Sequence, residues 1–125
     1  VEFEDVDIWP AALGIGNKGM FDVMTGGRGT GRAHNLPSAM GGMAGKTGTV
    51  QVRRITKEQR EAGITKNIER PWKERDHALF VGYAPVKNPR YAVAVVVEHG
   101  GSGSSMAAPI ARAALQRALE IGGKA

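Results

Sequence analysis

The stretch GGMAGKTGT, Gly41–Thr49, decides the fold because its last residues are compatible with two different structures. Residues Gly45–Thr47 match the end of the P-loop motif G-x-x-x-x-G-K-[ST], but that motif requires a glycine where this chain has Met40. A P-loop also opens a helix, whose N-terminus holds the phosphate. Here the next residues, TVQVRRI, are β-branched and alternate between polar and apolar. We therefore predict a strand over residues 44–54 and no phosphate loop.

The segments on either side of this strand predict a small α+β fold. Apolar spacing and turn residues place a helix and loop at 1–30, the strand at 44–54, a charged excursion at 55–76, a β-hairpin at 77–99 and a helix at 104–121. The short turn within the hairpin makes its strands antiparallel. We expect an antiparallel sheet with helices packed on it. Three strands and two helices form a thin core, which a longer chain or a partner segment would complete.

The two long helices have recognisable starts and apolar faces. In the first, Asp7 is placed to cap and Pro10 suits the first turn, and in the last, Ser104 or Ser105 is placed to cap. The apolar face predicted for the first helix comprises Trp9, Leu13, Met20, Val23 and Met24. The face predicted for the last helix comprises Ile110, Ala114, Leu115 and Leu119. We expect both faces to pack in the core.

The second strand of the hairpin, Tyr91–Gly100, consists almost entirely of alanine and valine up to Val97. A strand that is apolar on both sides is typical of a sheet that is covered on both faces. We therefore expect this strand to be buried on both faces.

The charged excursion carries most of the excess positive charge. The formal net charge of the chain is +5, and the residues from Arg53 to Asp76 include eight lysines or arginines and five acidic residues. Mixed charge of this kind is typical of a solvated segment. Within it, Thr56 and Gln59 match a capping box, and Gly63 is placed to end a short helix. An alternative hypothesis is a small basic module that contacts nucleic acid or an anionic surface through Arg53–Arg75.

Motifs for cofactors and metals lack the context that they need. GIGNKG, Gly14–Gly19, spells G-x-G-x-x-G, but no strand precedes it, and Asp22 is too near to serve as the acid of a dinucleotide site. The chain has no cysteine, and its histidines are too scattered for a recognisable metal site: His34, His77 and His99. We predict no cofactor, no metal, and structural roles for the histidines. We expect both tryptophans to pack in the core or under a lid: Trp9 and Trp72.

Lysine, threonine and glycine at the edge of a sheet suit acyl transfer. The Lys46 ammonium can stabilise negative charge, and the hydroxyls of Thr47 and Thr49 project from the same face of the strand, where they can bind one carboxylate. Gly48 has no side chain, so another element can pack closely behind the strand. A free backbone N–H of an edge strand can form part of an oxyanion hole.

The longer sequence context resembles the penicillin-binding proteins, in which K-T-G is one of three active-site motifs. WPAALGIGNKGMFDVMTGGRGTG, AGKTGTVQV and HALFVGYAPVKNPRYAVAVVVEHGGSGSSMAAPIARAAL are similar to the end of the transpeptidase domain of the class B members, and among these to the elongation-type enzymes. The resemblance covers nearly the whole chain, so residues 1–125 are interpreted as the C-terminal portion of such a domain. It implies part of a penicillin-binding transpeptidase fold, which is also the fold of serine β-lactamases.

The resemblance implies an acyl-transfer enzyme of peptidoglycan synthesis that works through a serine. Carried over by position, Lys46, Thr47 and Gly48 are the catalytic K-T-G residues. Thr47 and Thr49 bind the carboxylate of the substrate, and the backbone N–H of Thr49 is one oxyanion donor. The implied substrates are stem peptides that end in D-Ala-D-Ala, and β-lactams acylate the same serine. Neither a cofactor nor nucleic acid is implied.

The motifs that carry the nucleophile are absent from this sequence. It contains no S-x-x-K and no S-x-N, and the serines of the glycine-rich turn at 102–105 are explained by turn and capping roles. We therefore expect the remainder of the transpeptidase domain, with S-x-x-K and S-x-N, to be a partner of this chain, which alone is predicted to be inactive. The resemblance also implies cell-elongation machinery as a partner. It implies a location at the periplasmic face of the bacterial inner membrane, with the anchor in a segment absent from this chain.

Overall fold

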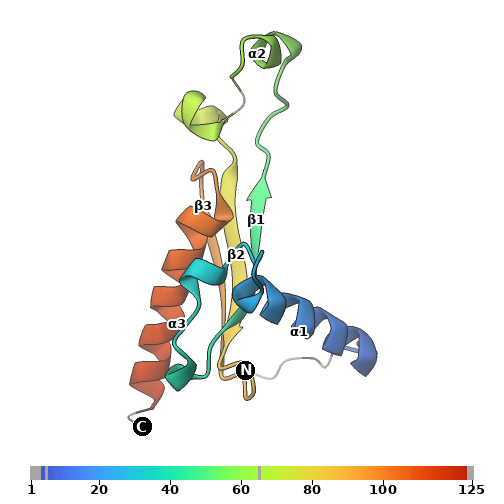
Figure 1. The fold of residues 1–125 in the computed structure, drawn as a ribbon, viewed down its shortest axis with the longest axis vertical. Helices are drawn as coiled ribbons and strands as arrows, with labels where there is room; N and C mark the ends of the chain where they lie inside the picture. Colours follow the sequence, from blue (N-terminus) through green and yellow to red (C-terminus); the bar gives the residue numbers. More distant parts are fainter. Residues whose placement is uncertain (1–3, 5, 65, 124–125) are drawn as a thin grey trace.

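The computed structural model describes residues 4, 6–64 and 66–123. Its helices and strands are α1 (Pro10–Thr25), β1 (Ala44–Val50), α2 (Lys57–Glu61), β2 (His77–Ala84), β3 (Tyr91–Val97) and α3 (Ala108–Gly122). Single 3₁₀ turns lie at Arg32–His34, Ser38–Met40, Asn67–Glu69 and Trp72–Glu74, and a π-helical turn, Gly103–Ala107, precedes α3. The predicted α+β class is confirmed (Figure 1). No helix among the described residues combines the length and the apolar composition of a membrane span.

The three strands form one antiparallel sheet in the order β1-β2-β3. The predicted hairpin of β2 and β3 is confirmed, and Thr47 of β1 lies opposite Phe80 of β2. The predicted end of the first strand is wrong: the alternation predicted a strand to residue 54, but β1 ends at Val50. Val50 pairs with His77, which is the first residue of β2, so among the described residues no strand lies opposite 51–54 to continue the ladder.

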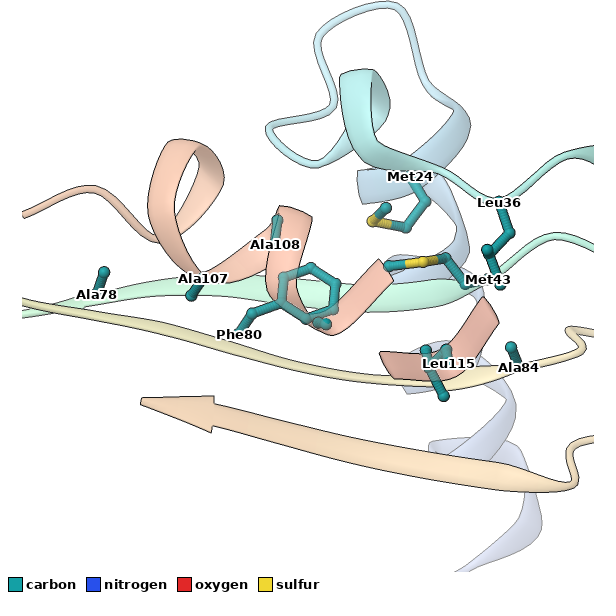
Figure 2. Close-up of a cluster of buried hydrophobic side chains, with 10 residues drawn as sticks. Met24, Leu36, Met43, Ala78, Phe80, Ala84, Ala107, Ala108 and Leu115 are labelled. Carbon is teal, nitrogen blue, oxygen red and sulfur yellow. The ribbon is translucent and has the colours of Figure 1, made fainter. Parts of the chain in front are cut away.

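The core lies between one face of the sheet and the helices (Figure 2). Phe80 is fully buried at its centre, and a Cβ on either Gly45 or Gly82 would collide with the Phe80 ring. These two glycines therefore make room for the phenyl group. The other buried apolar side chains of the cluster are Met24, Leu36, Met43, Ala78, Ala84, Ala107, Ala108, Ala111 and Leu115. Small residues on α3 and the turn before it let their backbone lie close to the sheet.

The opposite face of the sheet is open to solvent in the described chain. The residues of β3 that pack toward the core are Tyr91, Val93, Val95 and Val97, and those that are exposed are Ala92, Ala94 and Val96. Val96 is 62% exposed, and Val81 on the same face of β2 is 47% exposed. The prediction that both faces of β3 are covered is therefore wrong for this chain. The open face of β3 is apolar enough to be covered, but no described segment packs over it.

α1 begins later and is more exposed than the sequence predicts. Its N-cap is Trp9 rather than Asp7, and Pro10 occupies the first turn as expected. Trp9 is 74% exposed and Leu13 is 50% exposed, so the expected packing of this tryptophan is wrong. Only Met24 of the predicted apolar face is fully buried. Figure 1 shows the reason, because the C-terminal end of α1 lies against the sheet while the rest of the helix projects away from it.

The predicted apolar face of α3 is confirmed in part, at Leu115 and Leu119. Its side chains that are buried or packed against the core are Ala108, Ala111, Leu115 and Leu119. Ile110 is 50% exposed and Ala114 is exposed, which contradicts the predicted face. No side chain caps α3 or the π-helical turn before it, so neither Ser104 nor Ser105 is a cap. Because that turn runs directly into α3, it fixes which side of the helix faces the sheet.

The excursion between β1 and β2 begins with a correctly predicted helix. Thr56 Oγ1 accepts a hydrogen bond from Gln59 N at 3.3 Å, and Gln59 Oε1 accepts one from Thr56 N at 3.2 Å, which completes the capping box of α2. Gly63 follows with a φ of 75°, a left-handed conformation that favours glycine and ends the helix. Figure 1 shows α2 at the tip of the excursion, away from the sheet.

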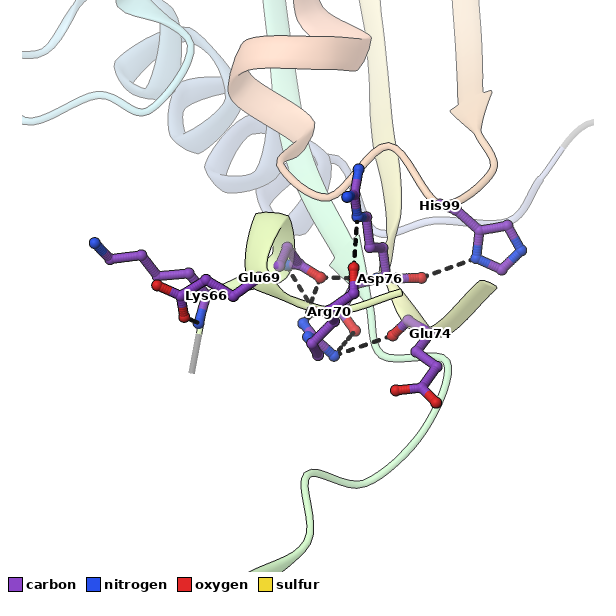
Figure 3. Close-up of polar contacts among 8 residues, drawn as sticks. Lys66, Glu69, Arg70, Glu74, Asp76 and His99 are labelled. Atoms are coloured by element: carbon purple, nitrogen blue, oxygen red, sulfur yellow. Dashed lines mark hydrogen bonds and ion pairs between the residues drawn. The ribbon is translucent and has the colours of Figure 1, made fainter. Parts of the chain in front are cut away.

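A buried ion pair holds the second half of the excursion together (Figure 3). Arg70 is 3% exposed and Asp76 is 8% exposed. Two guanidinium nitrogens of Arg70 donate to the two carboxylate oxygens of Asp76, at 3.2 and 3.0 Å. Asn67 donates to Asp76 Oδ2 at 3.0 Å and accepts from Asp76 N at 2.9 Å. Burial raises the pKa of Asp76, but hydrogen bonds from Arg70 and Asn67 and the charge of Arg70 outweigh it and lower this pKa below its ordinary value.

Candidate active site

β1 presents the K-T-G-T residues at an edge of the sheet. Within the described chain β1 pairs with β2 alone, so its other backbone edge is free. Successive side chains alternate between faces, so Thr47 and Thr49 share one face and Lys46 and Gly48 share the other. Thr47 is half-buried, whereas Lys46 and Thr49 are exposed. Two hydroxyl groups and one ammonium group are thus accessible along a short length of one strand.

An open hollow of about 470 Å³ lies between α1 and β1 beside Lys46. Its walls are the C-terminal half of α1, the glycine-rich loop at 26–30 and Lys46 itself. Lys46 Nζ donates to the carbonyl oxygen of Thr47 at 2.7 Å, and no carboxylate among the described residues forms an ion pair with it. Asp22, in the same wall, is already paired with Lys18 at 2.5 Å. Lys46 is therefore a cation that remains available to an anionic ligand.

The loop after α1 brings a second hydroxyl to Thr47. Thr30 Oγ1 lies 2.8 Å from Thr47 Oγ1, which is a hydrogen bond between two side chains 17 residues apart in the sequence. The sequence places Thr30 in a segment rich in turn residues and does not reveal this contact. The only local signal is the pair of glycines that flank it, Gly29 and Gly31.

The backbone behind Gly48 is closely approached by the turn that precedes α3. A Cβ on Gly103 would collide with the carbonyl oxygens of Gly48 and Leu79. The π-helical turn therefore lies directly on the backbone of β1 and β2. A Cβ on Gly48 would meet Leu79 and no atom of this turn, so the expected role of Gly48 in close packing is not what brings the turn here. The glycine that permits the approach is Gly103.

His77 and His99 have structural contacts, as predicted. His77 Nδ1 accepts a hydrogen bond from His99 N at 2.8 Å, and His99 Nδ1 lies 3.0 Å from the carbonyl oxygen of Arg75. Trp72 packs on His99 with ring centroids 4.5 Å apart, although its side chain is 56% exposed. For His34, which is half-buried in a 3₁₀ turn, the structural role stays a prediction. The described residues contain no group of three or more His, Asp or Glu placed to hold a metal ion.

The fold and the K-T-G strand together define a class of protein. The family described as "Penicillin binding protein transpeptidase domain" matches residues 7–116. The chain therefore belongs to the penicillin-binding protein transpeptidase family, and it is part of such a domain.

Three relatives show which proteins this chain is similar to. Peptidoglycan D,D-transpeptidase MrdA of Haemophilus influenzae is 39% identical over 109 residues, which make up 86% of this chain and 15% of that protein. Penicillin-binding protein 2 (PBP2) of Pseudomonas aeruginosa, solved in complex with WCK 5153, is 40% identical with a TM-score of 0.58 over 86% of this chain and 19% of that one. PBP2 of Helicobacter pylori, solved as a complex with MreC, is 25% identical with a TM-score of 0.67, and the match covers 92% of this chain and 18% of that one. The chain spans less than one fifth of the length of each relative.

Proposed function

We propose that the protein containing this chain is a peptidoglycan D,D-transpeptidase of the PBP2 type, and that the chain supplies the K-T-G wall of its acyl-transfer site. One observation carries the proposal: Lys46, Thr47 and Thr49 lie together on an edge strand, beside an open hollow, within the segment that matches the family. The relative from Haemophilus influenzae bears the name of this activity.

In the proposed reaction, a serine from the rest of the protein attacks the carbonyl carbon that links the last two D-alanines of a stem peptide. The bond between the serine oxygen and this carbon forms, the peptide C–N bond breaks, and the terminal D-alanine leaves with a proton on its amine. An amine of a neighbouring strand then attacks the acyl-enzyme, takes the acyl group and returns its proton to the serine. A β-lactam acylates the same serine when its amide C–N bond opens.

We assign the residues of β1 to binding and charge stabilisation in this reaction. The Thr47 and Thr49 hydroxyls donate to the terminal carboxylate of the substrate, and hydrogen bonds to a charged group are stronger than neutral ones. The Lys46 ammonium adds positive charge beside them. The free backbone edge of β1, with the N–H of Thr49, donates to the oxyanion that forms at the attacked carbonyl.

The remainder of the transpeptidase domain is the proposed partner that carries S-x-x-K and S-x-N. The uncovered apolar surface of this chain supports that proposal. On the open sheet face Val81 is 47% exposed and Val96 is 62% exposed, and on α1 Trp9 and Ile15 are 74% and 75% exposed. Large exposed apolar surfaces of this kind mark places where another part of a protein packs.

We further propose that the complete protein works with the cell-elongation machinery. The relative from Helicobacter pylori that was solved as a complex with MreC supports this partner class. The proposed location is the periplasmic face of the bacterial inner membrane, where stem peptides are cross-linked, with the anchor in a segment outside this chain.

Covalent labelling of the full-length protein by a fluorescent penicillin tests the proposed function. We expect one labelled serine, loss of the label when unlabelled penicillin is added in excess, and no label when the serine of S-x-x-K is replaced by alanine. Residues 1–125 alone should not be labelled, because they lack the nucleophile. A full-length protein that folds and yet is never acylated would contradict the proposal.

The alternative function is a basic module that contacts an anionic polymer through Arg53–Arg75. Three exposed basic side chains around a hollow of about 300 Å³ favour it: Arg54, Lys57 and Arg60. Against it, Arg70 is buried in its pair with Asp76, and Arg53 is paired with Glu74 at 2.8 Å. DNA binding that weakens steeply with salt, in a protein that penicillin does not label, would favour this module.

A further inference from the structure

Thr30 lies in a tight loop that is pressed onto the end of α1. A Cβ on Gly29 would collide with the carbonyl of Val23, and a Cβ on Gly31 would collide with the buried sulfur of Met24. Gly31 N also donates to the carbonyl oxygen of Val23 at 3.1 Å. The two glycines thus hold the loop against the helix. Thr30 lies between them in the sequence and carries the side chain at this point of the loop.

The side chain of Thr30 is directed at the K-T-G strand. Its Oγ1 lies 2.8 Å from Oγ1 of Thr47, while the Thr30 side chain itself is exposed. Backbone hydrogen bonds from Gly29 N to Gly26 O at 2.9 Å and from Gly31 N already hold the loop. The loop therefore does not need the Thr30 hydroxyl to keep its shape, and the contact serves Thr47.

The chemistry of a carboxylate ligand fixes the direction of this hydrogen bond. A hydroxyl group has one hydrogen to donate, and a carboxylate can only accept. Thr47 must therefore donate its hydrogen to the ligand, which leaves only its oxygen for Thr30. Thr30 is then the donor, and the two bonds run in one direction from Thr30 through Thr47 to the carboxylate. Hydrogen bonds in such a chain polarise and strengthen one another.

We propose that Thr30 is a positioning residue that orients the Thr47 hydroxyl toward the carboxylate of a stem peptide or β-lactam. The inference rests on the proposed function and extends the site beyond the K-T-G strand to the loop after α1. Without the Thr30 donor, the Thr47 hydroxyl is free to rotate and to turn its hydrogen toward water. Part of the ligand affinity is then lost, while the acyl-transfer step itself is unchanged.

The test compares acylation of the full-length protein by a fluorescent penicillin in the wild type and in Thr30→Val, Thr30→Ala and Thr30→Ser variants. Valine keeps the shape of threonine without the donor, and alanine removes the donor with a smaller side chain in case the valine variant does not fold. We expect both to lower the second-order acylation constant about three- to tenfold, as for the loss of one hydrogen bond. The change should lie in the dissociation constant of the non-covalent complex. Serine keeps the donor and should restore acylation to within about twofold of the wild type.

A double-mutant cycle separates positioning of Thr47 from a general structural effect. In a Thr47→Val background, Thr30→Val should cause no further loss, because the hydroxyl that it orients is absent. An equal loss in both backgrounds, wild-type acylation in Thr30→Val and Thr30→Ala, or a Thr30→Ser variant as impaired as Thr30→Val would each overturn the inference. In all three cases the wild type is still labelled, so the proposed function stands. A folded wild type that is never labelled overturns the proposed function instead.

Discussion

The K-T-G strand and the segment at 66–76 are both rich in polar side chains, but they use them in opposite ways. In the segment, Asn67, Arg70 and Asp76 bind one another in a network whose two charged members, Arg70 and Asp76, are buried. On β1, Lys46 and Thr49 are exposed, and within the described part of the chain the Lys46 ammonium bonds only to the carbonyl oxygen of Thr47. Buried polar groups need partners within the protein, whereas exposed groups remain free for a ligand. The comparison therefore separates polar residues that hold this fold from those that can act on a substrate.

Removal of one member of the buried ion pair should have the largest effect on stability of all the changes considered. Asp76→Ala leaves the Arg70 guanidinium buried without its counter-charge, so we expect a loss of about 3–5 kcal/mol in the free energy of unfolding. Urea unfolding of the full-length protein measures this loss. The double variant Arg70→Met, Asp76→Leu is the matched control, because it removes both charges and should lose much less. Equal losses in the two variants would show that the ion pair does not hold the segment.

Thr47→Val should have the opposite signature, with a large effect on activity and a small one on stability. A hydrogen bond to a charged group contributes about 1.5–3 kcal/mol, so acylation by a fluorescent penicillin should slow about 10- to 100-fold. The free energy of unfolding should fall by only about 1 kcal/mol, because the half-buried side chain loses one hydrogen bond, to Thr30. Thr47→Ser is the control that keeps the hydroxyl. An unchanged acylation rate in a folded Thr47→Val protein would remove this residue from the site.

The pH dependence of stability tests whether the ionised Asp76 stabilises the fold. The pKa of Asp76 is lowered from an ordinary value of 3.8, so the ionised carboxylate stabilises the folded protein. This contribution is complete above the unfolded-state pKa and is lost as the pH falls from there through the lower folded-state pKa. The free energy of unfolding should therefore fall more steeply on acidification below about pH 4 in the wild type than in Asp76→Asn. Identical slopes in the two proteins would refute this contribution.

The smallest effect is expected at the tip of the excursion. Thr56→Ala removes the capping box of α2 and should cost this helix about 1 kcal/mol or less. Faster amide hydrogen exchange at 57–61 would report the local loss, and penicillin acylation should stay at the wild-type rate because α2 lies away from the sheet. Substitution of the exposed Glu61 by alanine, which leaves the capping box intact, is the control. A drop in acylation would mean that the excursion takes part in the site.

Local signals in the sequence predicted those features that depend on residues close together in the chain. The Thr56–Gln59 capping box needs only four residues, and the hairpin of β2 and β3 needs only two strands and the turn between them. The K-T-G strand was predicted in the same way, from the alternation after Lys46. These patterns are specific because backbone geometry repeats every two residues in a strand and every 3.6 residues in a helix.

The sequence could not predict which apolar surfaces are covered. Periodicity shows which side chains share a face, but the cover comes from segments that are distant in the chain or outside it. Val96 and Trp9 are apolar and yet exposed, because no described segment lies over β3 on that face or over the start of α1. For α3, the π-helical turn fixes the rotation of the helix, so Ala111 is buried and Ile110 is not.

The α+β class, the order of the strands and the residue at which each strand begins follow from the sequence alone. Only the tertiary structure brought Thr30 to Thr47, because the loop after α1 reaches β1 across 17 residues of sequence. Contacts of this kind depend on how distant elements pack, and no local pattern of residues records that packing. The lysine and the threonines of the site are thus visible in the sequence, and the hydroxyl that orients one of them is visible only in the fold.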